Sequence, residues 1–325
     1  MPRRTQKSAK RTSGPSSQPL VSHSWLMKAI AAVVIVALIC AYLTLSLLFY
    51  QGQWQLVLHP KHETKPPETS SIRFGPDDSA TPQLTGRWLP AAPGARYANS
   101  TILFLPSGDG SLADFSATLD RLHNLGINVF VFDYRGYGYS ADTHPSQLRM
   151  TQDTESAWAY LNTSRGIPAR HIIPYGIGVG ASLATHLAAN HSDIPALILD
   201  SPSTDMEILG AVLDDPRTRF LPARMLFHEN FAIAQPLATL KTPKLFLLLN
   251  EPSKIATNKE TDPHSDAIEN LVDGAASPKI ISNLHAADFA GPLYGEQIRR
   301  FLDQFVAPPT PPLVPTPAPV PTNHP

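Results

Sequence analysis

The sequence predicts an α/β fold, in which a mostly parallel central sheet carries helices on both faces. Short apolar runs that are typical of strands alternate with runs of helical periodicity over most of residues 101–305. Such regular alternation indicates strand–helix–strand units and therefore a parallel sheet. Two of the apolar runs pass directly into glycine-rich turns, at 135–139 and 176–180. Glycine is expected there because it fits where the chain turns tightly against a neighbouring element.

The predicted elements follow one another in chain order. Entry strands are expected at 71–74 and 83–89, and a fully apolar strand at 101–105. An amphipathic helix at 113–125 ends at Gly126. The later strands are expected from 128 onward and at 171–175, 196–200, 244–249 and 279–281, and the later helices at 154–161, 181–189 and 297–305.

Residues 203–240 break this alternation while keeping many large apolar side chains. Ordinary helical packing against the sheet is one interpretation. A small helical cap over a functional site is the other.

Residues 174–182 carry the most informative motif, Pro-Tyr-Gly-Ile-Gly-Val-Gly-Ala-Ser. An apolar strand precedes the glycines and an Ala- and Leu-rich helix follows them. This is the frame of a nucleophile elbow, G-x-S-x-G, with Gly178 where the serine belongs. A dinucleotide-binding turn is the alternative, with Asp200 at the end of the next strand. The late position of the motif in the alternation argues against it, as does Ala181 in place of the third glycine.

A second block, 128–140, reads Asn-Val-Phe-Val-Phe-Asp-Tyr-Arg-Gly-Tyr-Gly-Tyr-Ser, a buried strand that runs into a glycine turn. Pro145-Ser146, Asp153 and Ala157-Trp158-Ala159-Tyr160-Leu161 follow it. Together these motifs resemble the serine hydrolases of the α/β-hydrolase superfamily, in particular a membrane-anchored, lysophospholipase- or peptidase-like branch. The resemblance covers about residues 48–305. It implies an α/β-hydrolase fold and gives Asp133 and Arg135 a structural role.

The resemblance assigns catalytic positions, and several of them are substituted. The nucleophile position matches Gly178, so no hydroxyl is present to attack or to carry an acyl group. The base position matches His285, in the loop after the last strand. The orienting acid position falls on Ser253 when the alignment is anchored on Ile255.

Two further substitutions concern the acid and the oxyanion turn. Without a gap, the acid position falls on Pro252, and the nearest acid, Glu251, is out of register. The oxyanion turn has lost its usual His-Gly pair, although backbone amides of Gly108 and Val179 remain to point inward. Asp109 in that turn would disfavour an oxyanion.

Three serines near the elbow are candidate replacements for the missing nucleophile. Ser182 lies one helical turn after the elbow, and Ser107 and Ser201 lie at strand ends without an elbow around them. The histidines show no metal-ligand spacing with acidic residues, so neither a metal nor a cofactor is expected.

Residues 29–50 carry no charge and are long enough to cross a bilayer. No acidic residue occurs before Glu63, whereas basic residues are frequent: Arg3, Arg4, Lys7, Lys10, Arg11 and Lys28. The positive-inside rule therefore predicts a cytoplasmic tail at 1–28 and an extracytoplasmic domain at 51–306, periplasmic in a bacterium. A cleaved signal peptide is the alternative, but the run is too long and no small-x-small site follows it.

The remaining sequence features limit the partners. The net charge of −1 gives no reason to expect a nucleic-acid partner. The single cysteine, Cys40, excludes an internal disulfide framework, and bulky Ile39 before it argues against a lipoprotein site. Residues 307–325 are Pro-rich and predict an extended tail, either merely solvated or a docking segment for a partner or for the cell wall.

These observations predict a membrane-anchored α/β-hydrolase-fold protein that is catalytically impaired, a pseudoenzyme that binds a small ester- or lipid-like ligand or acts as a scaffold. The alternative is a working hydrolase of esters or lipids that uses a non-standard nucleophile. The two differ in whether the protein becomes covalently acylated.

Overall fold

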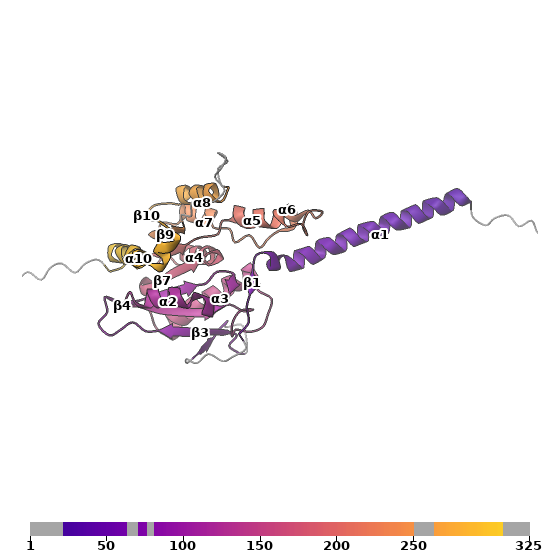
Figure 1. Ribbon diagram of the computed structural model, residues 1–325. Helices are drawn as coiled ribbons and strands as arrows, with labels where there is room; N and C mark the ends of the chain where they lie inside the picture. The colour runs from indigo at the N-terminus through magenta and orange to yellow at the C-terminus, as the bar shows by residue number, and fades with distance from the viewer. Residues whose placement is uncertain (1–21, 64–70, 77–80, 250–262, 308–325) are drawn as a thin grey trace, which may run out of the picture. The chain divides into compact units, whose positions relative to one another are not determined.

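The computed structural model describes residues 22–63, 71–76, 81–249 and 263–307 (Figure 1). The chain divides into two compact units, Met1–Phe49 and Tyr50–Pro325. Within the first unit lies most of helix α1 (His23–Gly52), whose apolar side chains are exposed along its length. This helix contains the whole predicted span, 29–50, and it is long and apolar enough to cross a membrane.

Within the described residues of the second unit, eight strands form one sheet in the order β10-β9-β8-β7-β4-β6-β3-β2. The strands from β10 to β6 run parallel, whereas β3 is antiparallel to β6 and β2 to β3. The strands are β2 (Ile72–Phe74), β3 (Leu84–Leu89), β4 (Tyr97–Leu105), β6 (Ile127–Asp133), β7 (Ile172–Ile177), β8 (Leu197–Asp200), β9 (Lys244–Leu249) and β10 (Lys279–Leu284).

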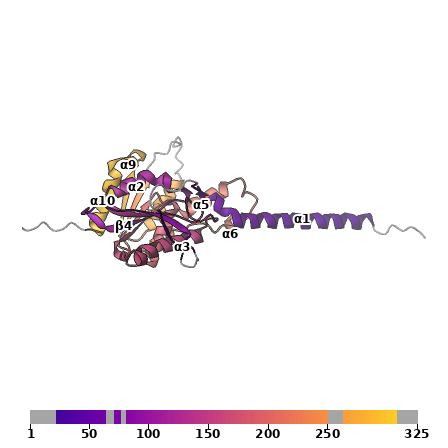
Figure 2. The same cartoon turned by 90° about the horizontal axis from the view of Figure 1, so that it is seen from below.

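Helices cover both faces of this sheet, and the predicted fold class is confirmed. The helices are α2 (Ser116–His123), α3 (Gln147–Ala159), α4 (Val179–Asn190), α5 (Asp205–Asp214), α6 (Ala223–Leu226), α7 (Ala234–Thr239), α8 (Pro263–Gly274), α9 (Ala286–Ala290) and α10 (Pro292–Phe305). In Figure 2, α2 and α10 lie on one side of β4 and α3 lies on the other.

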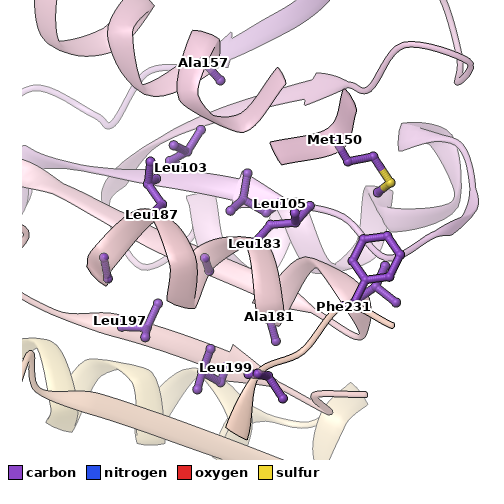
Figure 3. Close-up of a cluster of buried hydrophobic side chains, with 14 of the residues drawn as sticks. Leu103, Leu105, Met150, Ala157, Ala181, Leu183, Leu187, Leu197, Leu199 and Phe231 are labelled. Carbon is purple, nitrogen blue, oxygen red and sulfur yellow. The ribbon is translucent and has the colours of Figure 1, made fainter. Parts of the chain in front are cut away.

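The alternation of side chains along the strands builds two apolar cores. Leu103 and Leu105 of β4 join a core with residues of α3, α4, α7 and α8 (Figure 3). Ile102 and Phe104 of the same strand point to the other face, where α2 and α10 cover them. Because every second residue is buried on each face, the central strands are apolar throughout, as parallel strands are.

The connections place the functional edge of the sheet. From β4 the chain passes to β6 on one side, and the next strand, β7, returns to pair with β4 on its other side. The loops after β4 and β7 therefore leave in opposite directions, which opens a crevice at the carboxyl ends of these two strands. The elbow motif lies at this point.

Several element boundaries differ from the sequence-based expectations. Helix α3 begins seven residues before the expected 154, because Ser146 caps it by accepting a hydrogen bond from the Arg149 amide at 3.3 Å. The expected helix at 113–125 is a 3-10 turn, Leu112–Phe115, followed by α2. Helices α8 and α9 were not expected.

Candidate functional site

Gly178 lies between the end of β7 and the start of α4, with φ +56° and ψ −121°. This left-handed φ is unfavourable for residues with a side chain and easy for glycine. The Gly178 amide donates to the Asp200 carbonyl at 3.1 Å, and its carbonyl accepts from the Ser203 amide at 3.2 Å. The turn is thus held from both sides by the chain that leaves β8.

The flanking glycines are required by close packing, as the sequence predicted. A Cβ on Gly180 would lie 2.2 Å from the Leu105 carbonyl oxygen, and a Cβ on Gly176 would lie 2.2 Å from the Gly180 carbonyl oxygen. Both distances are far below van der Waals contact. Strand β7, helix α4 and the end of β4 consequently approach one another more closely than any side chain permits.

Gly178 itself lines a pocket. A Cβ there would lie 3.2 Å from the Ser107 Cβ and 3.5 Å from the Ser203 Oγ. These distances leave room for a small side chain after modest adjustment. The turn opens into a pocket of about 220 Å³, whose lining residues are Leu56, Val57, Ser107, Gly108, Asp109, Gly178, Val179, Ser203, Glu207, Ile208 and Ala211.

The two amides expected at an oxyanion site belong to residues of this pocket. Val179 is the first residue of α4, where backbone amides have no partner within the helix. Gly108 follows β4, and its carbonyl accepts from the Tyr137 hydroxyl at 2.9 Å and from the His59 amide at 2.8 Å. A Cβ on Gly108 would lie 2.5 Å from the Leu58 side chain, so a larger residue at this position requires the buried Leu58 side chain to move.

A histidine–carboxylate pair that the sequence reasoning missed lies at the rim of the pocket. His59 Nδ1 and Asp109 Oδ1 are 2.6 Å apart, and both side chains are largely exposed. Strands β1 (His59–Pro60) and β5 (Asp109–Gly110) bring them together by a two-residue parallel pairing. A pairing of two residues is too short to leave a recognisable pattern in the local sequence. The Asp109 amide also donates to the Ser107 Oγ at 3.3 Å.

His285 follows β10 and precedes α9, at the same edge of the sheet as Gly178, because β7 to β10 all run parallel. Its side chain is exposed, and its amide donates to the Asp288 carboxylate at 2.9 Å in a capping box. Two strands, β8 and β9, separate β10 from β7. Among the described residues that line the pocket there is no histidine. The expected acid position, Ser253, lies outside the described residues, as do Pro252 and Glu251.

The serines near the elbow differ in their surroundings. Ser182 is fully buried in α4 and donates to the Ala232 carbonyl at 3.2 Å, which fastens the 203–240 segment to α4. Ser201 has a positive φ of 43° and donates to the Asp200 carboxylate at 3.0 Å. Ser107 and Ser203 line the pocket beside Gly178.

Asp200 lies behind the elbow in a buried polar cluster. Its Oδ2 accepts from the Tyr175 hydroxyl at 2.5 Å and from the Tyr294 hydroxyl at 3.0 Å. Burial raises the pKa of the Asp200 carboxyl, and the two hydroxyls oppose that rise by hydrogen bonding. The carboxylate thus links β7, β8 and α10 through hydrogen bonds. In the dinucleotide-binding alternative it would instead bind a ribose hydroxyl, and these bonds already occupy it.

The Asp133–Ser140 block forms a structural turn. A Cβ on Gly138 would overlap the Asp133 carboxylate, which accepts hydrogen bonds from the amides of Tyr139 at 3.2 Å and Leu112 at 3.4 Å. Burial raises the pKa of Asp133 to about 6. Arg135 pairs with the buried Asp153 at 2.6 Å. These contacts tie the loop after β6 to the 3-10 turn Leu112–Phe115 and to α3.

No group of three or more potential metal ligands occurs among the residues that the structure describes. The site therefore consists of a glycine elbow, two candidate backbone donors, two serine hydroxyls and a rim histidine–aspartate pair.

A strand, a glycine turn and a helix at the carboxyl edge of a largely parallel, helix-covered sheet define the α/β-hydrolase fold. The comparison with solved structures agrees. An esterase from Pyrococcus furiosus superposes with a TM-score of 0.56 at 15% identity, over 77% of this chain and 100% of that one. An α/β-hydrolase from Vibrio vulnificus superposes with a TM-score of 0.50 at 22% identity, over 68% of this chain and 76% of that one.

Sequence comparison defines the family more closely. Residues 98–286 match the serine aminopeptidase S33 family, and the chain belongs to this family. An uncharacterized protein of Mycobacterium tuberculosis is 27% identical over 85% of this chain and 96% of its own length. The α/β-hydrolase domain-containing protein 17B of Xenopus tropicalis is 35% identical over 35% of this chain and 38% of its own length.

Proposed function

We propose that this chain is a membrane-anchored member of the serine hydrolase family that binds a ligand at its elbow and does not form an acyl-enzyme. The observation that carries this proposal is Gly178. Its backbone adopts the strained turn in which such enzymes present their nucleophile, with φ +56°, yet it offers no hydroxyl. Without Oγ there is no group to attack a carbonyl carbon or to hold an acyl group.

In this proposal the catalytic positions of the family are present in the fold, but the side chains at these positions cannot perform the acyl-transfer reaction. Gly178 stands at the nucleophile position and His285 at the base position. Ser253 stands at the acid position, where a hydroxyl does not fix an imidazole as a carboxylate does. The amides of Gly108 and Val179 are the parts of the machinery that glycine substitution does not remove, and they serve as donors to a ligand oxygen.

The lining of the pocket favours a small ester- or lipid-like ligand. Leu56, Val57, Ile208 and Ala211 provide apolar walls, and the backbone amides of Gly108 and Val179 provide candidate donors. An acyl chain with a carbonyl group matches this division between apolar walls and polar donors.

The anchor and the topology form the second part of the proposal. Residues 29–50 span the membrane, the basic residues 1–28 lie in the cytoplasm, and the domain at 51–306 lies outside it. The Pro-rich residues 307–325 are either a solvated tail or a docking segment for a partner.

A working hydrolase with a different nucleophile is the second candidate, and one observation favours it. The place of a Gly178 Cβ lies 3.5 Å from the Ser203 Oγ and 3.2 Å from the Ser107 Cβ, and Asp109, which pairs with His59, donates its amide to the Ser107 Oγ. In this case Ser203 or Ser107 attacks the substrate and the Asp109-paired His59 takes the proton.

Hydrolysis of short activated esters and of lysophospholipids separates the two candidates. The wild-type full chain is compared with Ser203→Ala, Ser107→Ala and His59→Ala. We expect wild-type turnover at the level of buffer and no change in any variant. Wild-type turnover that falls at least a hundredfold in Ser203→Ala or Ser107→Ala would establish the second candidate and overturn the first.

A further inference from the structure

Two of the most exposed large apolar side chains in the described residues lie in the 203–240 segment. Phe220 is 83% exposed and Met225 is 87% exposed, more than any exposed large apolar side chain of α1. Met206 and Leu213 of α5 add further exposed apolar surface. Single exposed hydrophobic residues are ordinary, but several within twenty residues indicate an interaction surface.

Basic residues alternate with this apolar surface. Arg219 and Arg224 immediately precede Phe220 and Met225 and are exposed. Arg217 is exposed as well and pairs with Asp215 at 2.6 Å. We call residues 219–225 the basic-apolar loop. Apolar side chains beside arginines suit the boundary between lipid headgroups and acyl chains, where arginine stems lie along apolar surface and guanidinium groups reach phosphates.

The chain that leaves the apolar helix is bound directly beside this loop. Gln53 is fully buried. Its Nε2 donates to the Tyr50 carbonyl at 2.9 Å and to the Leu226 carbonyl at 3.3 Å. The same Nε2 lies 2.6 Å from His228 Nδ1. The Gln53 Oε1 accepts from the amides of His228 at 2.7 Å and Glu229 at 3.4 Å.

These bonds fix how far the loop lies from the end of the apolar helix. The Tyr50 and His228 rings are 4.6 Å apart between centroids. Met225 precedes His228 by three residues, so their Cα atoms are at most about 10 Å apart. Tyr50, the last residue of the proposed span, and the basic-apolar loop therefore lie close together within the second unit.

We propose that the basic-apolar loop binds the anionic surface of the lipid bilayer that residues 29–50 cross. This inference rests on the proposed anchor. It also gives the pocket a membrane-facing setting, because Leu56 and Val57 of its wall follow the anchor and Ile208 and Ala211 belong to α5. A ligand that enters the pocket from this side is an amphiphile that leaves the bilayer.

Spin labelling of the full chain in lipid nanodiscs tests the proposal. A nitroxide is attached at Phe220→Cys or Met225→Cys in a Cys40→Ser background, since Cys40 is the single cysteine. Ser192→Cys is the matched control, because this exposed serine lies before β8, at the opposite edge of the sheet. The wild-type Cys40, labelled in the native chain, reports on the anchor.

We expect labels at 220 and 225 to gain accessibility to oxygen and to lose accessibility to a water-soluble nickel chelate when phosphatidylglycerol is present, while the label at 192 does not change. Cys40 should be lipid-accessible in every preparation. If Cys40 is lipid-accessible and the labels at 220 and 225 stay as aqueous as the label at 192, the loop proposal is wrong and the anchor stands. If Cys40 is aqueous, both fail.

Removal of the two arginine charges completes the test. Each basic residue near an anionic surface contributes a factor of about five to binding. Arg219→Gln with Arg224→Gln should therefore reduce the membrane-bound population of the 225 label roughly 25-fold in anionic discs. An unchanged population would contradict the role of the arginines. Spin–spin broadening at 220 and 225 without oxygen access would show a second copy of the chain on this surface and would overturn the proposal.

Discussion

Gly178 has the backbone conformation that presents a catalytic side chain in this fold, although glycine has no side chain to present. A tight bend between β7 and α4 is compatible with many sequences, but φ +56° at the wall of a pocket is the geometry that presents a side chain to that pocket. We interpret the site as an elbow in which glycine replaces the residue that carries the nucleophile. The flanking glycines, Gly176 and Gly180, keep the close packing that the turn requires.

Gly178→Ser should not restore esterase activity, or should restore it only weakly. The Oγ would return, but in the proposed assignment the acid position holds Ser253 and the oxyanion turn lacks the His-Gly pair that is usual in the family. Each lost element of such a site lowers the rate by about 10²–10⁴. The assay is hydrolysis of a short activated ester by the wild type, Gly178→Ser, and Gly178→Ser with Ser253→Asp. Robust activity of the single variant would mean that another carboxylate supplies the acid.

Asp133 should make the fold more stable at mildly acidic pH. Its folded pKa of about 6 lies above the ordinary 3.8, because burial disfavours the charged form. The neutral form is therefore favoured by folding. Its stabilising contribution is complete below pH 3.8 and is lost as the pH rises through 6, by at most about 1.4 kcal/mol per pH unit.

The measurement is the free energy of unfolding between pH 4 and pH 8 for the wild type and Asp133→Asn. The substitution should flatten the profile in this window, while the exposed control Asp193→Asn should leave it unchanged. A profile of Asp133→Asn that runs parallel to the wild type would show that Asp133 is charged throughout and paired in some other way.

At the scale of elements, β4, β7 and α4 meet in a contact that tolerates no added side chain. Gly180→Ala should destabilise the domain by about 3 kcal/mol or more, because its Cβ would lie 2.2 Å from the Leu105 carbonyl oxygen and only a backbone shift relieves this. Gly178→Ala should cost about 1–3 kcal/mol, from its positive φ alone.

Gly210 of α5 provides the matched control, since nothing lies within 4 Å of its Cβ position. Gly210→Ala should stabilise the protein by about 0.5–1 kcal/mol through helix propensity. Urea denaturation of the three variants gives the order Gly210→Ala, Gly178→Ala, Gly180→Ala from most to least stable. A Gly180→Ala variant as stable as Gly178→Ala would contradict the close approach of strand and helix.

Strong local patterns gave the elements that the sequence predicts well. Strand β9 occupies the expected 244–249 because it is a continuous apolar run in front of a break. The start of α3 was missed because Gln147, Leu148 and Arg149 carry no apolar periodicity, whereas the Ser146 cap decides the boundary. Helix termini depend on such single hydrogen bonds and are therefore less predictable than helix interiors.

The site was predictable only where its parts are contiguous in the sequence. Gly178 and its flanking glycines lie within one motif. The His59–Asp109 pair joins residues fifty positions apart through strands of two residues. The attachment of Gln53 to Leu226 and His228 spans still more of the chain. Tertiary packing alone creates both contacts.

At the scale of the whole molecule, the basic residues that precede the apolar run fix the expected orientation. Protease added to intact spheroplasts of a bacterial host should digest the chain beyond Trp54 and spare the N-terminal tail, because the positive-inside rule retains residues 1–28 in the cytoplasm. Immunoblots against tags at both ends provide the measurement. Digestion that requires permeabilised cells would reverse the topology.

The proposed absence of acyl-enzyme chemistry is tested most directly by a fluorophosphonate probe, which reacts covalently with activated serines. The full chain is treated with the probe, and intact mass and peptide mapping locate any adduct. We expect no adduct in the wild type, under conditions in which an active serine hydrolase is fully labelled. A stoichiometric adduct on Ser203 or Ser107 of the wild type would contradict this expectation and would identify the protein as a working hydrolase with a displaced nucleophile.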